Sequence, residues 1–558
     1  MIRSWWENDR SMFVRIKKTG NYSYVQIVEN RREGTSVKQH LVATIGQYEA
    51  LSASGKLDDL ARSFLKYAKS VRTVDALREG SIRARRTAKI GPALVFDRLW
   101  RELGIDTIID EMLEGTRYKF SIERSIFLTV LHRLFDPGSD RAAERWKDDF
   151  KIEGAGGIQL HQLYRSMEWL GEGTVQMGSD PRSLKMRKDS IEERLFRRTR
   201  DLFSELEIVF FDTTSLYFEG DGGESIGQYG HSKDSRPDLK QMIVGAVLDG
   251  NGHPICCELW PGNVSDVTAL MPVVEKLKDR FGISSVCIVA DRGMISKDVI
   301  AQMESDERKM KYILGVRMRK TAEVRDVILG SDEPYTEAVG PRQRSKDPSP
   351  LAVREQIIEG RRYIVCRDED QARKDEADRQ AIVESLKEHL KAGDKSLVGN
   401  NGYRKFLAVT GSEHFTIDEE RIEDERRYDG MWVLRTNTDL DAIDVARKYK
   451  QLWMVEDAFR SVKSVLSTRP VYHKTDDTIR GHVFCSFLAL VLLKELESRL
   501  EGRGLKLEWH DIKRDLCALE EVEVDIEGQT WHLRTDLRGV CGEVFKAVGV
   551  AIPPAARC

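Results

Sequence analysis

The chain contains 558 residues, of which 41% are hydrophobic and 32% are charged, and its formal net charge is −3. This length is several times the roughly 150 residues of a typical domain, and the composition is globular, which excludes a single small module and a largely disordered chain. No apolar run reaches the roughly 18 residues of a bilayer span, and the eight cysteines include no Cys-x-x-Cys pair. The first residues also lack the apolar stretch of a signal peptide. We therefore expect several domains, a cytoplasmic location, no membrane and no zinc site.

Positive charge is concentrated near the N-terminus. Residues 1–100 contain 19 Lys and Arg against 10 Asp and Glu, although the whole chain is slightly acidic. Such an excess is typical of a surface that meets a polyanion such as DNA, and a solvated basic surface is an equally good interpretation. The tightest cluster, which we predict to follow a phosphate backbone, consists of Arg83, Arg85, Arg86 and Lys89.

The first 204 residues are predicted to form two domains. Alternating apolar residues between 12 and 46, interrupted by glycine turns, predict a small, basic antiparallel β-domain over 1–56 that contacts DNA. The pattern then changes to a helical period, which predicts a helical accessory, DNA-binding domain over 57–204. One of its helices is expected at 122–135, where Asp136-Pro137-Gly138 ends it.

A different pattern begins at Glu207, with runs of apolar residues that are typical of buried strands. The expected strands are 208–212, 242–248, 255–260, 286–291 and 312–316. Amphipathic helices at 266–281 and 296–306 separate the last three strands. Three strands in hairpin order, followed by helix, strand, helix and strand, is the order of an RNase H-like fold with a mixed five-stranded sheet. A right-handed crossover would place the fourth strand beside the first, so that Asp212 and Asp291 end neighbouring strands.

This RNase H-like core is predicted to be interrupted. We assign its first part to 205–317 and its second part to 429–502. Between them, the charge-rich residues 318–428 combine a long helical pattern with short strands, which predicts an inserted α+β subdomain. The tail, 503–558, has a mixed and less informative pattern. The fold class is therefore α/β, with a small β-platform and a helical accessory domain before an interrupted catalytic core.

A helix is expected from about Leu440 to Leu466, and five of its side chains share one face at about 100° per residue. These side chains are Tyr449, Leu452, Glu456, Arg460 and Lys463. Alone, a carboxylate among cations on a helix is usually a surface ion-pair stripe. Its place after a sheet that ends in two aspartates favours a catalytic role for Glu456.

Three carboxylates from two strands and a helix can bind two divalent cations. Mg²⁺ prefers oxygen ligands, and two ions roughly 4 Å apart activate a water and stabilise the leaving oxygen of a phosphodiester. Each aspartate alone has a simpler interpretation as a turn residue, but together with the glutamate they favour a metal site. We predict that Asp212, Asp291 and Glu456 are the catalytic and metal-binding residues, with two Mg²⁺ ions that Mn²⁺ can replace. The sequence has no Gly-x4-Gly-Lys-Ser/Thr loop, so we expect no nucleotide cofactor.

Several segments carry a family resemblance. Val209–Ser215, Ile288–Met294 and Tyr449–Lys463 resemble the three catalytic blocks of bacterial insertion-sequence transposases with a DDE triad, of the "insertion sequence four" type. Further landmarks of that family resemble Gly230–Asp238, Pro261–Asp266 and Arg469–His473. The opening segment, Phe13–Tyr48, resembles the N-terminal region of one branch of these transposases. The resemblance covers nearly the whole chain, and is least specific in the inserted subdomain and the tail.

The resemblance implies a DNA transposase that binds the terminal inverted repeats of its element. Metal-assisted hydrolysis would free a 3′-hydroxyl at each element end, and that hydroxyl would then attack target DNA. The family pattern makes Asp212, Asp291 and Glu456 the DDE triad. The partners implied are the double-stranded DNA of the element ends and of the target. Because two ends must be joined, we expect a homodimer in the active complex.

The resemblance also implies that Tyr449 and Lys463 contact the DNA end. Many relatives have an arginine at the position of Leu452, and leucine cannot contact phosphate. Arg460 lies on the same predicted face and is expected to replace that arginine, because its guanidinium is long.

Three cations in the loop after the first core strand, Lys233, Arg236 and Lys240, are predicted to follow a DNA backbone, with a solvated loop as an equal alternative. Two other function classes stay open. One is an RNase H-like nuclease, such as a resolvase, that cuts DNA without strand transfer. The other is a DNA-binding regulator descended from a transposase. The complete set of acids argues against the regulator, and the accessory N-terminal half argues against the plain nuclease.

Overall fold

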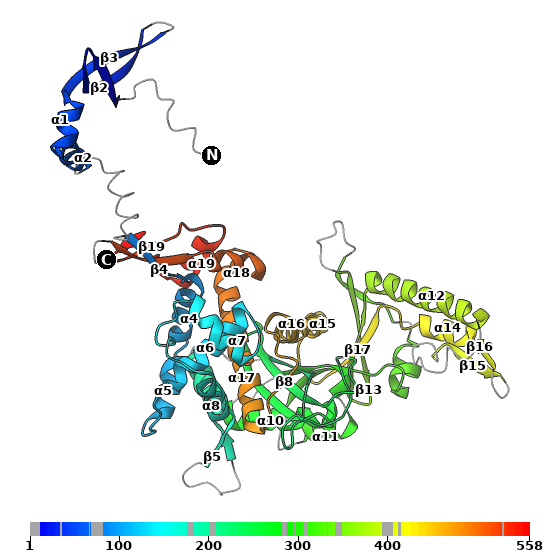
Figure 1. The fold of residues 1–558 in the computed structure, drawn as a ribbon. Helices are drawn as coiled ribbons and strands as arrows, with labels where there is room; N and C mark the ends of the chain where they lie inside the picture. The colour runs from blue at the N-terminus through cyan, green and yellow to red at the C-terminus, as the bar shows by residue number, and fades with distance from the viewer. Residues whose placement is uncertain are drawn as a thin grey trace. The chain divides into compact units, whose positions relative to one another are not determined.

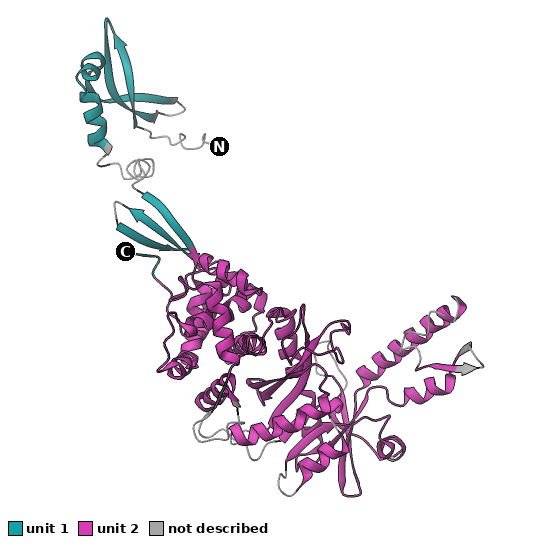
Figure 2. Ribbon diagram, turned by 60° about the horizontal axis from the view of Figure 1, so that its bottom comes forward, with its two compact units in different colours: residues 1–87, 521–535, 554–558 teal, residues 88–520, 536–553 magenta. Residues whose placement is uncertain are grey.

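The computed structural model describes residues 12–33, 36–65, 67, 82–175, 184–199, 208–281, 287–294, 296–305, 310–331, 333–340, 349–392, 405–410, 414–526 and 529–558 (Figure 1). The chain divides into two compact units. The first contains residues 1–87, 521–535 and 554–558, and the second contains residues 88–520 and 536–553 (Figure 2). None of the helices in the described ranges is long and apolar enough to cross a membrane.

The first unit begins with an antiparallel sheet of three strands, β1 (Met12–Thr19), β2 (Tyr22–Glu33) and β3 (Ser36–Gln47). Two short helices, α1 (Tyr48–Ala53) and α2 (Lys56–Leu65), follow the sheet. The turn between β1 and β2 needs glycine, because Gly20 has a φ of 63°. These strands confirm the antiparallel sheet that the alternating residues predict.

The second sheet of this unit joins two distant parts of the chain. Its order is β20-β19-β18-β4, and its strands are β4 (Ile82–Lys89), β18 (Glu520–Ile526), β19 (Gln529–Arg534) and β20 (Ala556–Arg557). An ion pair joins Arg85 of β4 to Asp525 of β18, which lie 440 positions apart. The prediction that residues 57–204 are helical is therefore wrong at β4, and the tail is more regular than its pattern indicates. A strand whose partner is so distant gives little local signal, because strand propensity depends on cross-strand packing.

The second unit contains a helical bundle around α6 (Ile122–Phe135), α8 (Leu160–Gly171) and α17 (Asp476–Glu501). Its other helices are α4 (Gly91–Glu102), α5 (Ile105–Leu113), α7 (Asp140–Trp146), α9 (Arg187–Thr199), α18 (Trp509–Cys517) and α19 (Cys541–Val548), and β5 (Gly173–Val175) pairs with β6 (Leu184–Met186). Helix α6 has the predicted bounds. It begins where the Ser121 hydroxyl accepts a hydrogen bond of 3.0 Å from the Arg124 N–H, which caps the helix.

Helices α8 and α17 approach each other closely at two glycines. A Cβ on Gly171 would lie 1.9 Å from the carbonyl oxygen of Asp477, and a Cβ on Gly481 would lie 1.9 Å from that of Met167. Only glycine fits at such distances. Helix α17 also packs against α6 and reaches β9, so this long helix joins the bundle to the sheet of the same unit.

A nine-stranded sheet forms the core of the second unit, in the order β12-β13-β14-β17-β11-β10-β7-β8-β9. The five strands expected from the sequence are β7 (Ile208–Tyr217), β8 (Gln241–Asp249), β9 (Pro254–Pro261), β10 (Cys287–Ala290) and β11 (Lys311–Gly315). Helix α10 (Asp266–Phe281) leads from β9 to β10, which pairs in parallel with β7. Helix α11 (Lys297–Glu304) then leads to β11, on the other side of β10. The predicted RNase H-like order of these strands and helices is confirmed.

The sheet has nine strands rather than five, because three strands of the inserted segment and one strand from the second part of the core join it. The additional strands are β12 (Thr336–Val339), β13 (Leu351–Ile358), β14 (Arg361–Arg367) and β17 (Met431–Thr436). Strand β17 is antiparallel to both of its neighbours, β11 and β14. The rest of the insertion comprises the π-helical segment Glu323–Ile328, α12 (Glu369–Ala392), β15 (Leu407–Thr410), β16 (His414–Ile417) and α14 (Glu419–Arg426) (Figure 1). The insertion thus extends the core sheet instead of standing apart from it.

The helix expected from 440 to 466 is broken. Helix α15 (Ala442–Lys450) ends before Leu452, α16 (Trp453–Arg460) begins after it, and the π-helical turn Ser461–Val465 follows. Helix α15 packs against β10, β11, β13 and β14, whereas α16 packs against β7 and β8. Leu452 is buried in the core, while Glu456 and Arg460 are exposed. The prediction of five side chains on one continuous helix face is therefore wrong.

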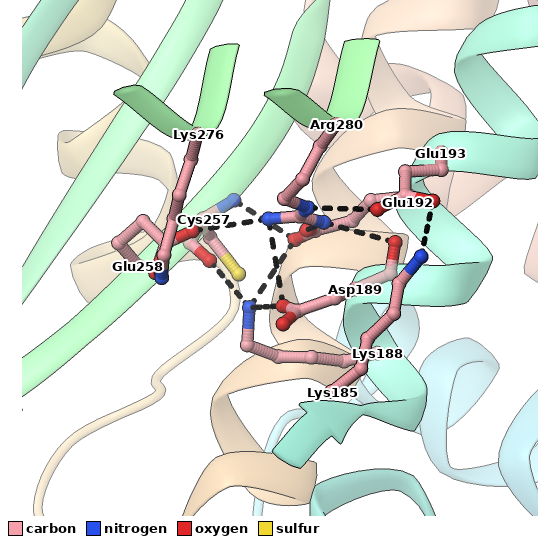
Figure 3. A network of polar contacts seen from close by, with 9 residues as sticks. All are labelled: Lys185, Lys188, Asp189, Glu192, Glu193, Cys257, Glu258, Lys276 and Arg280. Atoms are coloured by element: carbon pink, nitrogen blue, oxygen red, sulfur yellow. Dashed lines mark hydrogen bonds and ion pairs between the residues drawn. The ribbon is translucent and has the colours of Figure 1, made fainter. Parts of the chain in front are cut away.

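A network of buried ion pairs ties α9 to β9 and α10 (Figure 3). The Lys188 ammonium lies 2.8 Å from an Asp189 carboxylate oxygen and donates a hydrogen bond of 2.8 Å to the Cys257 carbonyl. Arg280 of α10 lies 2.7 Å from Glu192. Burial opposes ionisation of Asp189, but the charges of Lys188 and Arg280 lower its pKa to about 2. The network contains Lys185, Lys188, Asp189, Glu192, Glu193, Glu258, Lys276 and Arg280.

We predict that Lys188→Met lowers the free energy of unfolding by about 3–5 kcal/mol, because it leaves buried carboxylates without their partner. Lys188 is 4% exposed, and Glu192 is 1% exposed. The matched control is Lys276→Met, which removes the same charge from a side chain that is 42% exposed, and should cost about 1 kcal/mol or less. Urea unfolding of the full chain measures both values. Equal losses for the two variants would contradict the role given to the buried pairs.

Candidate active site

Two aspartates lie side by side on the core sheet. Strands β7 and β10 are parallel, and Phe211 is the partner of Ala290, so Asp212 and Asp291 are the next residues on adjacent strands. The neighbouring position expected from a right-handed crossover is confirmed. Asp212 does not end its strand, however, because β7 continues to Tyr217 in antiparallel pairing with β8. Asp212 therefore lies within β7, beside the point where β10 ends.

Acidic groups crowd around Asp212. Burial, together with the charges of Asp291 and Asp266, raises the pKa of Asp212 to about 6, although Lys233 and the N–H of Thr213 oppose this shift. That N–H donates a hydrogen bond of 2.7 Å to an Asp212 carboxylate oxygen. A half-buried carboxylate among like charges is typical of a functional site, and divalent cations are attracted to such a site.

Asp266 is a third acid near this pair, at the first position of α10. The Thr213 hydroxyl donates a hydrogen bond of 2.6 Å to one Asp266 carboxylate oxygen, and the Lys233 ammonium lies 3.1 Å from the other. Lys233 also donates to the Thr213 carbonyl at 2.8 Å. Asp266 and Thr213 are not among the site residues that the sequence predicts. The signal was present, because Pro261–Asp266 is one of the family landmarks and Thr213 directly follows Asp212.

Tyr449 holds Asp291 from the side of α15. Its hydroxyl donates a hydrogen bond of 2.9 Å to an Asp291 carboxylate oxygen. Burial raises the pKa of Tyr449, so the hydroxyl keeps its proton and remains a donor. A Cβ on Gly315 of β11 would lie only 2.4 Å from this hydroxyl, so glycine is needed at that position. The structure thus uses the Tyr449 hydroxyl, which we expected to contact DNA, to position a carboxylate.

Glu456 is exposed on α16 and lines a cavity of about 470 Å³ together with Asp291, Arg292, Tyr449 and Lys450. Asp212 does not line that cavity. Within the described ranges, no group of three or more His, Cys, Asp or Glu side chains is arranged to hold a metal ion. The structure therefore brings Asp212 to Asp291, and brings Glu456 into the same cavity as Asp291.

The cations of the predicted DNA contact near the core have internal partners. Lys463 is 15% exposed and lies 2.7 Å from Asp234, which Arg469 also contacts. Arg236 lies 2.9 Å from Asp238, and the Lys240 ammonium donates a hydrogen bond of 2.9 Å to the Asp221 carbonyl. With Lys233 bound to Thr213, the loop of residues 230–240 is held against β7.

Arg460 is the predicted DNA contact on α16, and it is open to solvent. Its side chain is 72% exposed and lies 3.5 Å from Asp457. In the other unit, Arg83, Arg85 and Arg86 are exposed on β4, where Arg85 is paired with Asp525.

Comparison with known proteins identifies the family. The family model described as Transposase DDE domain matches residues 203–492, and the model described as IS1634 family transposase, N-terminal domain, matches residues 14–74. No curated protein sequence matches. A similar solved structure is the cryo-EM structure of a piggyBac transposase synaptic complex with hairpin DNA, at 10% identity over 76% of this chain and 79% of that chain, with a TM-score of 0.38.

The matched DDE domain covers more than half of the chain, and its order of strands is the RNase H-like order described above. The chain belongs to the transposases with a DDE domain, a class of enzymes that cleave and join DNA and depend on divalent metal ions. Both family matches name transposases, and the N-terminal match places the chain among those of insertion sequences.

We predict that Tyr449→Phe raises the Mg²⁺ concentration for half-maximal DNA cleavage by about tenfold, because partners that orient metal-binding carboxylates typically change metal affinity by that order. DNA affinity without metal should not change. The matched control is Tyr363→Phe, which removes another hydroxyl donor to a carboxylate, here 3.2 Å from Glu323. A Mg²⁺ titration of strand nicking measures the effect. An unchanged titration curve for Tyr449→Phe would show that the hydroxyl does not position Asp291.

Proposed function

We propose that this transposase cuts and joins DNA with Asp212, Asp291 and Glu456 as its catalytic acids. The observation that carries the proposal is the parallel pairing of β7 with β10, because it sets Asp212 beside Asp291 within the DDE domain. The raised pKa of Asp212, about 6, supports it further, since strongly perturbed carboxylates gather at functional sites. Glu456 is assigned as the third acid because it follows these strands on α16 and lines the same cavity as Asp291.

The donor set suits a hard divalent cation. Carboxylate oxygens are the ligands that Mg²⁺ and Mn²⁺ prefer. Positive charge at Asp212 and Asp291 would offset the burial and the repulsion that together raise the pKa of Asp212. We therefore assign these two residues and Glu456 to hold two Mg²⁺ ions, with Mn²⁺ as a substitute. When bound, such ions supply an activated water and stabilise charge on the leaving oxygen.

Other residues of the chain position these acids. The Tyr449 hydroxyl orients the Asp291 carboxylate, and the Thr213 N–H orients that of Asp212. Lys233 carries a positive charge beside Asp266, at the edge of the pair. This charge is placed to attract a DNA phosphate to the acids, since phosphate contacts fix the register of a bound duplex.

We propose double-stranded DNA, from the element ends and from the target, as the partner. Terminal inverted repeats are the part of the element that the protein would bind. The residues assigned to contact DNA are Arg460, Lys463, Lys233, Arg236, Lys240, Arg83, Arg85 and Arg86, whereas Tyr449 is assigned to hold Asp291. Since no helix in the described ranges could cross a membrane, we assign the protein to the bacterial cytoplasm and its nucleoid.

Two features of the chain point to different groups of insertion-sequence transposases. The three catalytic blocks resemble the "insertion sequence four" type, and the matched N-terminal domain is named for IS1634. We propose that the chain belongs to the branch that carries this N-terminal domain, because an N-terminal match to residues 14–74 is more specific than short motifs around the acids.

The proposal is tested with a labelled duplex that carries the gene's own flanking ends, in Mg²⁺. Asp212→Asn and Glu456→Gln should each reduce nicking by more than about 100-fold, which is the upper end for changes to residues that only support metal ligands. The matched control is Asp457→Asn, the next residue on α16, which lies 3.3 Å from Lys494 and should nick normally. Joined products in a target plasmid separate a transposase from a plain nuclease. Normal nicking by either acid variant removes that acid from the catalytic set.

We also propose that the active complex is a homodimer, because two element ends must be cut and joined together. Light scattering of the full-length Asp212→Asn variant with end duplexes should give the mass of two protomers and two duplexes. The variant is used because it holds the complex before cleavage. A mass of one protomer with one duplex would contradict the dimer.

A further inference from the structure

The N-terminal sheet carries polar side chains from all three strands on one face. Arg15 of β1 is the cross-strand partner of Gln26 of β2, and Gln26 is the partner of Thr44 of β3. Partners across antiparallel strands project from the same face of a sheet. Gln39 of β3 joins them, because the Arg15 guanidinium reaches it. We name these four residues, Arg15, Gln26, Gln39 and Thr44, the polar face.

The side chains of the polar face hold one another in place. The Arg15 Nη1 donates a hydrogen bond of 2.6 Å to the Gln39 side-chain carbonyl, and its Nε and Nη2 donate to the Gln26 carbonyl at 3.3 Å and 3.2 Å. The Gln26 amide in turn donates to the Thr44 hydroxyl at 3.5 Å. A guanidinium and two amides are thus oriented across the sheet before any partner binds. Such preorganisation reduces the entropy cost of binding.

Gln39 and Thr44 of the polar face are exposed, Arg15 and Gln26 are half-buried, and Val28 between the strands is buried, whereas helix α1 contacts the opposite face. Glu49 of α1 bonds to Ser23, and a Cβ on Gly46 would lie 3.0 Å from Leu51 of α1. Val25 is the cross-strand partner of Gly46. Along β2, Val25 is one position and Ser23 three positions from Gln26, so both side chains project away from the polar face. On the polar face, the Arg15–Gln39 bond is exposed, and Leu41 of β3 is 54% exposed.

The chemistry of this face matches the edges of DNA base pairs. Arginine pairs with guanine O6 and N7 through two hydrogen bonds, glutamine pairs with adenine N6 and N7, and apolar side chains contact the thymine methyl group. The major groove admits strands of a β-sheet. The segment 12–47 contains six Lys and Arg against two Asp and Glu, so the strands also carry the positive charge that phosphates attract.

We propose that the polar face reads base edges in the major groove at the element ends, with Arg15, Gln26 and Gln39 as residues that determine sequence specificity. The inference rests on the proposed function, since only a protein that acts at element ends has to select them. Duplex DNA is favoured over a protein partner because two amides and a guanidinium stand together beside lysines such as Lys17. Lysine alone would be enough to contact phosphates, whereas planar guanidinium and amide groups can form the paired hydrogen bonds that base edges offer.

The test measures discrimination by the full-length protein without metal. Fluorescence anisotropy gives the affinity for a duplex of the gene's own flanking end and for a duplex with the same bases in shuffled order. Arg15→Lys keeps the charge and removes the two-pronged contact, so the ratio of the two affinities should fall by about 10- to 100-fold. Affinity for the shuffled duplex should stay the same. Gln39→Ala, which changes no charge, should lower the same ratio.

The matched control is Arg31→Lys. Arg31 is also an exposed arginine of this sheet, and its side chain is 63% exposed and lies 2.8 Å from Glu29. It follows Asn30, the cross-strand partner of Gln39, so it projects from the face opposite to the polar face. Its replacement should leave the ratio unchanged. Dimethyl sulfate, which methylates guanine N7 in the major groove, supplies a second readout. The parent protein should protect guanines of the end duplex, and Arg15→Lys should lose part of that protection.

Equal ratios for Arg15→Lys, Gln39→Ala and the parent would overturn the proposal. So would a parent that binds both duplexes equally well. If Arg15→Lys unfolds, as circular dichroism would reveal, Gln39→Ala decides the outcome. Nicking in Mg²⁺ is scored on the same preparations. If the parent protein nicks DNA but binds both duplexes equally well, this inference fails and the catalytic assignment stands. If the parent protein prefers the end duplex but never nicks it, this inference stands and the catalytic assignment fails.

Discussion

Parallel pairing of β7 with β10 brings two carboxylates together, and the arrangement of the second unit follows from that pairing. Parallel neighbours cannot be joined by a short turn, so the chain leaves the sheet after β9 and returns through α10. The same crossover places Asp266, at the start of α10, near the pair. The arrangement is electrostatically costly, because burial and like charges raise the pKa of Asp212 to about 6. Such a cost is typical of groups kept for their chemistry.

Residues from distant parts of the chain hold this costly arrangement in place. Tyr449 reaches Asp291 from α15, and Lys463 reaches Asp234 in the loop held against β7. Away from the acids, the buried ion pairs around Lys188 join α9 to β9 and α10 (Figure 3). The rigid supports of the sheet are therefore polar as well as apolar. Each support leaves a buried charge or donor unpaired if it is removed, which is why such contacts are costly to lose.

Local patterns predicted a large part of the fold. The bounds of α6 followed from a helical period and an Asp-Pro-Gly stop, and the first five core strands followed from runs of apolar residues. Other features had no local signal. Strand β4 depends on β18, far along the chain, and the break at Leu452 depends on which strands α15 and α16 pack against. Asp266 was visible only as part of a landmark segment, because nothing in its own position indicates that a crossover brings it to Asp212.

The sequence by itself determined the class of protein and the pairing of Asp212 with Asp291. Both depend on features that a sequence contains directly, namely motifs of fixed spacing and the handedness of a crossover between strands. Only the tertiary structure decided that Lys463 pairs with Asp234, that Tyr449 supports Asp291, and that Arg15 meets two glutamines across a sheet. These contacts join side chains that are distant in sequence, so their geometry exists only once the strands and helices have packed.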